Sequence, residues 1–206
     1  TRTLADSERP AAITPDGDCV AFKADRGYDL LANEGGSAQG IYLWDNSTGT
    51  PVITLVSKDA FGIAATSAAN PRISDDCRFV AYESGDEFLT ADDKNSKTDV
   101  FLYDTIEDTT DLISTNAAGD SSDGTSSVAA LDWDETTGEG VVLILSSASN
   151  IRGTAGGNSV IDLFSVPFTV ESDPEPNVGG LTALGSPVRL LNTRTSGTKV
   201  GALDGN

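Results

Sequence analysis

One acidic segment of this sequence carries side chains that could bind a metal ion. Asp93, Asn95 and Asp99 follow one another as hard oxygen donors, at a spacing with which a turn can wrap a calcium ion. Asn158 and Asp162 repeat part of this spacing further along the chain. The segment lacks the complete calcium-loop pattern, so an alternative is that these side chains bond only to their own backbone. The sequence therefore predicts calcium as the cofactor, with these five residues as candidate ligands.

Catalytic chemistry is not favoured by the residue types. The chain has no His and no Met, which removes the usual general base near neutral pH and the common ligands of zinc and haem. Neighbouring carboxylates such as Asp75 and Asp76 could in principle cleave a glycosidic bond, but with 32 acidic residues some pairing is inevitable. We expect a non-catalytic protein. The alternatives are a propeller with a glycoside hydrolase-like or lyase-like acidic site, or a carbohydrate-binding module.

The charge balance limits the choice of partners. With 13 Lys and Arg against 32 Asp and Glu, the net charge is −19, which repels nucleic acids and anionic membranes. No apolar run approaches the roughly 18 residues that a membrane-spanning helix requires. The sequence predicts other proteins as partners, with no nucleic acid and no membrane insertion.

Two cysteines and one sequon bear on the cellular compartment. Cys19 and Cys77 could form a disulfide in an oxidising compartment, or remain as two buried thiols. Asn46 begins an Asn-Ser-Thr glycosylation sequon in an expected turn, where an ordinary polar turn is the alternative. An extracellular, cell-surface or periplasmic location would permit both modifications.

The chain repeats itself, and this repeat must position the polar segments. Residues 13–22 match 73–82, and residues 30–45 lie without a gap over 89–104. A third, weaker copy follows, in which Asp162 aligns with Asp99. Each copy holds short, β-prone apolar stretches separated by turns rich in Asp, Asn and Gly, and helical periodicity is nearly absent.

The repeat predicts an all-β chain with about three four-stranded antiparallel blades of a β-propeller, because each unit offers four strands in about sixty residues. The predicted blades cover residues 7–66, 67–126 and 127–200 of a single segment spanning 1–206. Residues 1–6 are predicted to be the fourth strand of a preceding or closing blade. The proline-rich and acidic stretch 171–177 is expected to be an exposed loop.

The quoted strands resemble a known family. An Asp-Gly-x-x-Val-Ala-Phe strand, a polar loop and an Asp-Val-Phe-Leu-Tyr-Asp strand are similar to the WD-like repeat of TolB-type bacterial propeller proteins. The resemblance is strong in the first two units and weak in the third. It implies an exported β-propeller that acts mainly in protein association, but it implies no single activity.

Three blades are fewer than the four to eight of closed propellers. The chain is therefore expected to be a partial propeller or a subunit of a larger one, because exposed blade faces and edge strands favour association. The functional hypothesis is an exported, non-catalytic propeller module for structural association or protein–protein interaction, stabilised by calcium.

Overall fold

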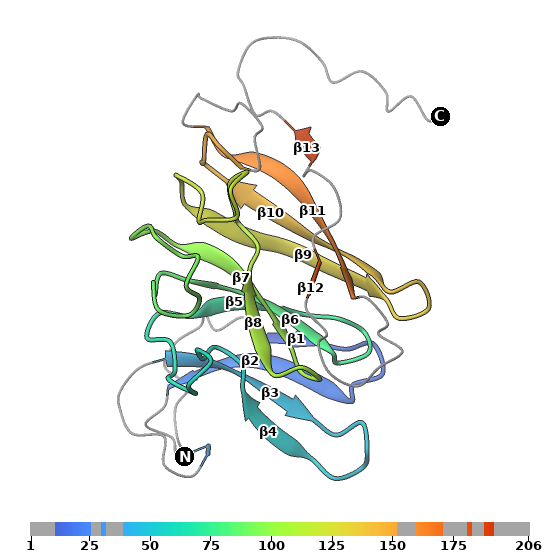
Figure 1. Ribbon diagram of the computed structural model, residues 1–206. Coiled ribbons are helices and arrows are strands. Elements are labelled where there is room, and N and C mark those ends of the chain that lie inside the picture. The colour runs from blue at the N-terminus through green and yellow to red at the C-terminus, as the bar shows by residue number, and fades with distance from the viewer. Residues whose placement is uncertain are drawn as a thin grey trace.

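The computed structural model describes residues 11–25, 30–31, 39–151, 160–170, 181–182 and 188–191. For Asp25 and the last two ranges, only the backbone is described. Three sheets, each built on consecutive antiparallel strands, stack face to face, as Figure 1 shows from the blue first sheet to the orange third. The described part of the chain contains no helix that could cross a membrane. Asn158, the predicted strand 1–6 and the loop 171–177 lie outside the described residues.

The first two sheets are four-stranded meanders in which every strand pairs with the next. The first blade consists of β1 (Ala11–Ile13), β2 (Cys19–Asp25), β3 (Gln39–Asp45) and β4 (Val52–Leu55). The second blade consists of β5 (Ala69–Ile73), β6 (Phe79–Ser84), β7 (Asp99–Asp104) and β8 (Thr109–Leu112). Strand order and stacking are those of consecutive propeller blades.

The third blade has longer strands and a different outer part. It consists of β9 (Ser126–Asp134), β10 (Glu139–Ser146) and β11 (Asp162–Val170), and both β12 (Leu181–Thr182) and β13 (Val188–Leu191) pair with β11. The pairing of β9 with β10 shifts register between Leu143 and Ile144 and continues to Ser126, so β9 is nine residues long. The short strand β12 was not expected from the sequence.

A shared turn explains why the first hairpin of the first two blades forms. Thr14 donates its hydroxyl to Asp16 at 2.6 Å, and Ser74 donates to Asp76 at the same distance. The next residue in each turn has a positive φ, 81° at Gly17 and 66° at Cys77. This left-handed conformation suits glycine and strains a side chain, so the second blade holds a cysteine where the chain geometry favours glycine.

The strands are apolar on both faces because each blade is covered by its neighbours. In β6, Val80 and Tyr82 face the first blade, whereas Phe79 and Ala81 face the third, and all four are fully buried. Phe22 stacks on Tyr42 in the first blade at 5.9 Å between ring centroids. Tyr82 stacks on Phe101 at 5.7 Å in the second, so the repeated residues occupy equivalent environments.

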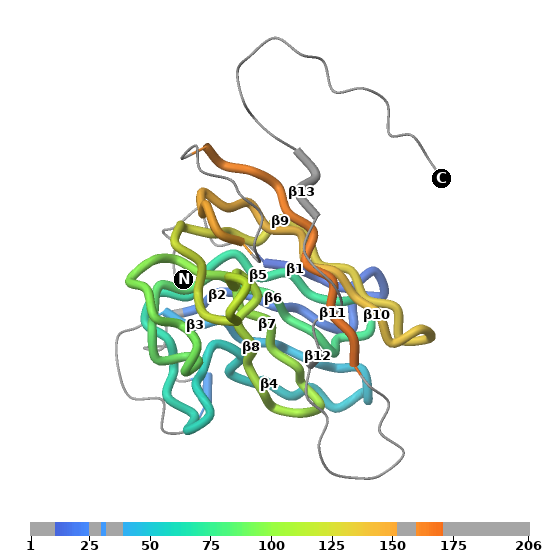
Figure 2. Tube along the Cα trace, turned by 45° about the horizontal axis from the view of Figure 1, so that its top comes forward, coloured from blue at the N-terminus to red at the C-terminus, as the bar shows by residue number. Residues whose placement is uncertain are grey.

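The first strands of the blades lie on one side of the stack. Strand β5 contacts both β1 and β9, and the Arg72 side chain of β5 donates to the Ala129 carbonyl of β9 at 3.1 Å. Figure 2, turned by 45° from Figure 1, shows β1, β5 and β9 on one side and β4 and β8 on the other. The first strands therefore face the propeller axis, and the fourth strands face outwards.

Candidate functional site

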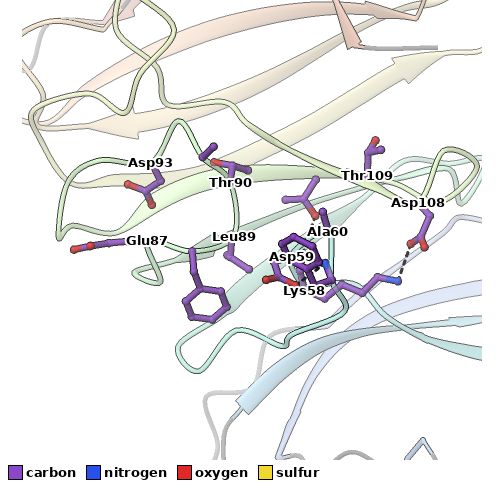
Figure 3. A pocket seen from close by; sticks show the side chains of 13 residues that line it. Lys58, Asp59, Ala60, Glu87, Leu89, Thr90, Asp93, Asp108 and Thr109 are labelled. Atoms are coloured by element: carbon purple, nitrogen blue, oxygen red, sulfur yellow. Dashed lines mark hydrogen bonds and ion pairs between the residues drawn. The ribbon is translucent and has the colours of Figure 1, made fainter. Parts of the chain in front are cut away.

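A pocket of about 520 Å³ lies beside the outer strand β8 of the second blade (Figure 3). Its walls come from the connection between β4 and β5, the loop between β6 and β7, and the start of β8. The side chains that carry the argument below are those of Lys58, Phe61, Glu87, Phe88, Thr90 and Asp93. Because β8 is an outer strand, this pocket does not open on the propeller axis.

Asp93 is the most buried acid of the pocket, with 6% of its surface exposed. Its Oδ1 accepts a long hydrogen bond of 3.3 Å from the Asn95 backbone N–H, whereas Oδ2 is buried and has no hydrogen-bond partner among the described residues. Burial raises the pKa of the Asp93 carboxyl, the N–H of Asn95 and the nearby Ser121 hydroxyl oppose this, and the Glu87 charge adds to it. The Thr90 hydroxyl is likewise buried without a partner in the described part of the chain.

The loop holds the other predicted calcium ligands in its own hydrogen bonds. Asn95 turns its amide nitrogen towards Asp99 and the Ser122 carbonyl, at 2.8 Å each, and its amide oxygen accepts from the Lys97 N–H at 2.6 Å. The Ser114 hydroxyl donates to the other oxygen of Asp99. Asp93, Asn95 and Asp99 are thus close in the loop but do not all direct oxygens at one point, and calcium binding stays a prediction.

Asp99 is fully buried, and burial raises its pKa to about 6, although hydrogen bonds from Ser114 and Asn95 lower it. Asp162 occupies the same place in the third blade, because it pairs with Ser146 as Asp99 pairs with Ser84. It is also buried. The alignment of these two residues therefore reflects a repeated position at the start of a strand, and both lie inside the blades.

Cys19 of β2 and Cys77 of the turn before β6 form a disulfide, with their Cα atoms 5.9 Å apart. The bond joins the first blade to the second. Asp45 places Oδ1 3.4 Å from the Cys19 sulfur. The sequon residue Asn46 lies in the turn after β3, where its carbonyl accepts from the Gly49 N–H at 2.8 Å and its side chain is partly exposed.

Sequence reasoning missed most of the pocket. Lys58, whose Nζ lies 2.7 Å from Asp108, and Phe61, which is 90% exposed, belong to the connection between the first and second blades. The connection after the second blade repeats its backbone hydrogen bonds, but has Thr115 and Ala118 at these two places. Phe88 and Glu87 precede the predicted calcium segment. The large apolar residues Phe61 and Ile63, in a connection that is not a strand, are the sequence signal that could have pointed to this surface.

Neither a protein-family model nor a curated protein matches the chain. Solved structures that resemble it include the tricorn protease, at 17% identity and a TM-score of 0.43. A putative TolB from Agrobacterium tumefaciens has 13% identity and a TM-score of 0.37. The β-propeller domain of the Trilobed protease from Pyrococcus furiosus has 11% and 0.36.

The alignments cover 86%, 89% and 89% of this chain, which spans 17%, 52% and 57% of those three chains in the same order. The chain therefore spans about half of the TolB structure and less than three fifths of the Trilobed protease domain. The fold itself rests on the strand order and the blade packing described above, and membership of the TolB-type repeat family stays a prediction.

Proposed function

We propose that this chain is an exported, non-catalytic β-propeller module that associates with further propeller blades. The observation that carries the proposal is the outer face of the third blade, which no other blade covers among the described residues; it is called the free face below. It has apolar residues, Leu143 and Leu163, at two of the positions that are buried against the next blade in the first two blades, whereas Ser165 replaces the buried Leu43 and Leu102. The occupant that fits this face is another blade of the same repeat, because the corresponding faces of the first and second blades are each covered by the following blade.

The comparison of equivalent positions supports the proposal. Ile41 in the first blade and Val100 in the second are fully buried against the following blade, whereas their equivalent in the third, Leu163, is only partly buried. Leu143 and Leu145 of β10 point to the same side as Leu163, and Leu145 is 38% exposed. An apolar sheet face of this kind favours association because covering it removes apolar surface from water.

The first blade has a partly covered apolar cluster on the side that faces away from the second blade. Phe22 and Ile53 are partly buried there, whereas Tyr42 is already fully buried within the chain. In a preparation of this chain alone, the blade that meets the third blade must come from a second copy. Head-to-tail contacts of this type close into rings when the rotation allows it, and two copies would supply six blades, within the range of closed propellers.

Export is supported by the disulfide between Cys19 and Cys77, because such bonds persist in oxidising compartments. A non-catalytic role is supported by the structural hydrogen bonds that acids of the adjacent pairs already accept. Asp76 accepts from the Ser74 hydroxyl and from Trp133 Nε1, at 2.6 and 2.9 Å. Asp134 accepts from the Thr136 N–H at 2.8 Å, so these carboxylates close turns.

The test is the mass of the chain in solution by light scattering over a series of concentrations. We expect assemblies that are multiples of 21.3 kDa, and a shift to the monomer in Leu145→Asp, because a charge on the free face cannot be buried. Ile106→Asp is the matched control, since Ile106 is 67% exposed on a turn away from this face. A wild-type monomer at every concentration would overturn the proposed association.

A further inference from the structure

We propose that the pocket beside β8 binds an alkyl chain that ends in an ammonium or guanidinium group, presented as a Lys or Arg side chain by a basic segment of a partner protein. This inference rests on the proposed association function in one respect, namely that the side chain comes from a partner protein. The contact proposed for the free face does not involve this pocket, so the pocket would bind a second kind of partner. The partner recognised here differs from the blade that covers the third sheet.

The polar end of the pocket contains a carboxylate oxygen and a hydroxyl group whose hydrogen-bonding capacity is not used. Asp93 Oδ2 and Thr90 Oγ1 are both buried, and neither has a partner among the described residues. In Figure 3, Asp93 and Glu87 lie at the same end of the pocket. A buried carboxylate oxygen without a donor is costly, and a bound cation with N–H groups removes that cost by donating charge-assisted hydrogen bonds.

Part of the remaining wall is apolar. Phe61 is 90% exposed and Phe88 44% exposed, and Leu89 lies between Phe88 and Thr90 in the chain. Rings and aliphatic groups next to carboxylates suit a long side chain, because its methylene stem packs on the rings while its charged head reaches the acids. A bare metal ion would make no use of this apolar wall.

The charges of the lining favour a cation. Lys58 is the single basic residue among the residues that line the pocket, and its Nζ lies 2.7 Å from Asp108. Asp59, Glu87 and Asp93 add three more carboxylates to the same lining. The net charge of −19 on the whole chain adds a long-range attraction for basic partners.

The test is an NMR titration of the ¹⁵N-labelled full chain with Nα-acetyl-lysine N-methylamide, with the norleucine analogue as the neutral probe. We expect saturable shifts of the amides of residues 87–93 with the lysine compound and none with the norleucine compound. Asp93→Asn should weaken binding of the lysine compound at least about tenfold, because each lost charge-assisted hydrogen bond is worth about 1.5–3 kcal/mol.

Asp75→Asn is the matched control, because it removes the same charge from an exposed turn outside the pocket lining and should leave binding unchanged. If Asp93→Asn alters the fold, as its own amide spectrum would show, Glu87→Gln provides the second variant and should also weaken binding. The proposal is overturned if neither compound binds or if both bind equally. Leu145→Asp should keep full binding of the lysine compound, which separates this test from that of blade association.

Discussion

The two interfaces between blades are closed by different chemistry at the same position of the repeat. Cys19 of the first blade and Phe79 of the second are equivalent, and each is fully buried against the next blade. Cys19 forms a disulfide with Cys77. Phe79 instead packs edge-on against Trp133 and Phe168, at 4.7 and 5.2 Å between ring centroids. One interface is thus covalent, and the other relies on a cluster of three rings.

The difference shows that a blade interface depends on the size of the side chain at the start of the second strand of the blade. A cysteine is too small to reach across to the next sheet by packing alone, so the bond replaces the missing contact area. In the second interface, Trp133 and Phe168 stack at 5.7 Å with an interplanar angle of 8°, and Trp133 Nε1 donates to Asp76. Aromatic pairs of this kind add about 0.5–1.5 kcal/mol beyond the area that they bury.

The largest effect is expected from removing the covalent link. Cys19→Ala, or reduction of the bond, should lower the free energy of unfolding by about 4 kcal/mol, because the disulfide closes a loop with a sequence separation of 58. Urea denaturation with and without dithiothreitol measures this, and Cys19→Ala should then be insensitive to the reductant. A loss below about 1 kcal/mol would mean that packing alone holds the first interface.

Two substitutions of Cys77 separate the effect of the disulfide from the effect of the backbone conformation at this residue. Cys77→Gly and Cys77→Ala both remove the disulfide, but Cys77 has a φ of 66°, which glycine adopts without strain. We expect the glycine variant to be the more stable of the two by about 1 kcal/mol. Equal midpoints of urea unfolding would contradict the importance of the repeated turn that Gly17 forms in the first blade.

The aromatic interface can be broken by Phe168→Ala. This variant should lose about 3 kcal/mol of stability, because a buried ring that contacts both Phe79 and Trp133 leaves a cavity. Phe61→Ala is the control, since Phe61 is 90% exposed, and we expect a change within about 0.5 kcal/mol. Thermal or urea unfolding measures both, and similar losses in the two variants would show that the ring cluster is not the main contact.

A further difference between the two blades predicts a dependence on pH. Asp111 of β8 pairs with Leu102, whereas Thr54 pairs with Leu43 at the equivalent place in the first blade. Burial, followed by the charges of Asp104 and Asp92, raises the pKa of Asp111 to about 6. The folded chain therefore binds this proton more tightly than the unfolded chain, and the contribution of Asp111 to stability falls as the pH rises from about 4 to about 6.

Asp111→Asn should for this reason stabilise the chain at pH 7, by about 1 kcal/mol after allowance for solvent screening. The gain should vanish below about pH 4, where the wild-type carboxyl is protonated in both states. Chemical unfolding of both proteins at pH 4, 5, 6 and 7 checks the trend. A gain that does not change across this series would assign the effect to packing.

The smallest effect is expected from calcium. Within the loop that holds Asp93, Asn95 and Asp99, only Asp93 has a carboxylate oxygen without a hydrogen-bond partner, so we expect a weak site. A dissociation constant of about 1 mM would add about 0.4 kcal/mol of stability when calcium is present at that same concentration. The melting midpoint should rise with calcium chloride and fall back with a chelator, and Asp93→Asn should remove the rise. Identical midpoints would exclude calcium from this loop.

Much of the fold follows from local sequence. Apolar strands such as 79–82 and 100–103, separated by turns with Asp, Gly and Asn, predict the strands and hairpins, since alternation and turn chemistry are properties of neighbouring residues. The same local reasoning identified Asp93, Asn95 and Asp99 as oxygen donors. It could not tell that Asn95 turns its amide nitrogen to Asp99 and Ser122, because that orientation depends on a carbonyl from another loop.

The sequence by itself determined a repeating antiparallel β-architecture, because a repeated pattern of apolar and turn residues dictates the same local hydrogen bonding wherever it occurs. Only the tertiary structure decided which distant residues meet. It brought Cys19 to Cys77, and it placed Phe61 of one connection beside Asp93 of another in one pocket. These contacts depend on how one blade stacks on the next, and that stacking is set by side chains that lie some sixty residues apart in the chain.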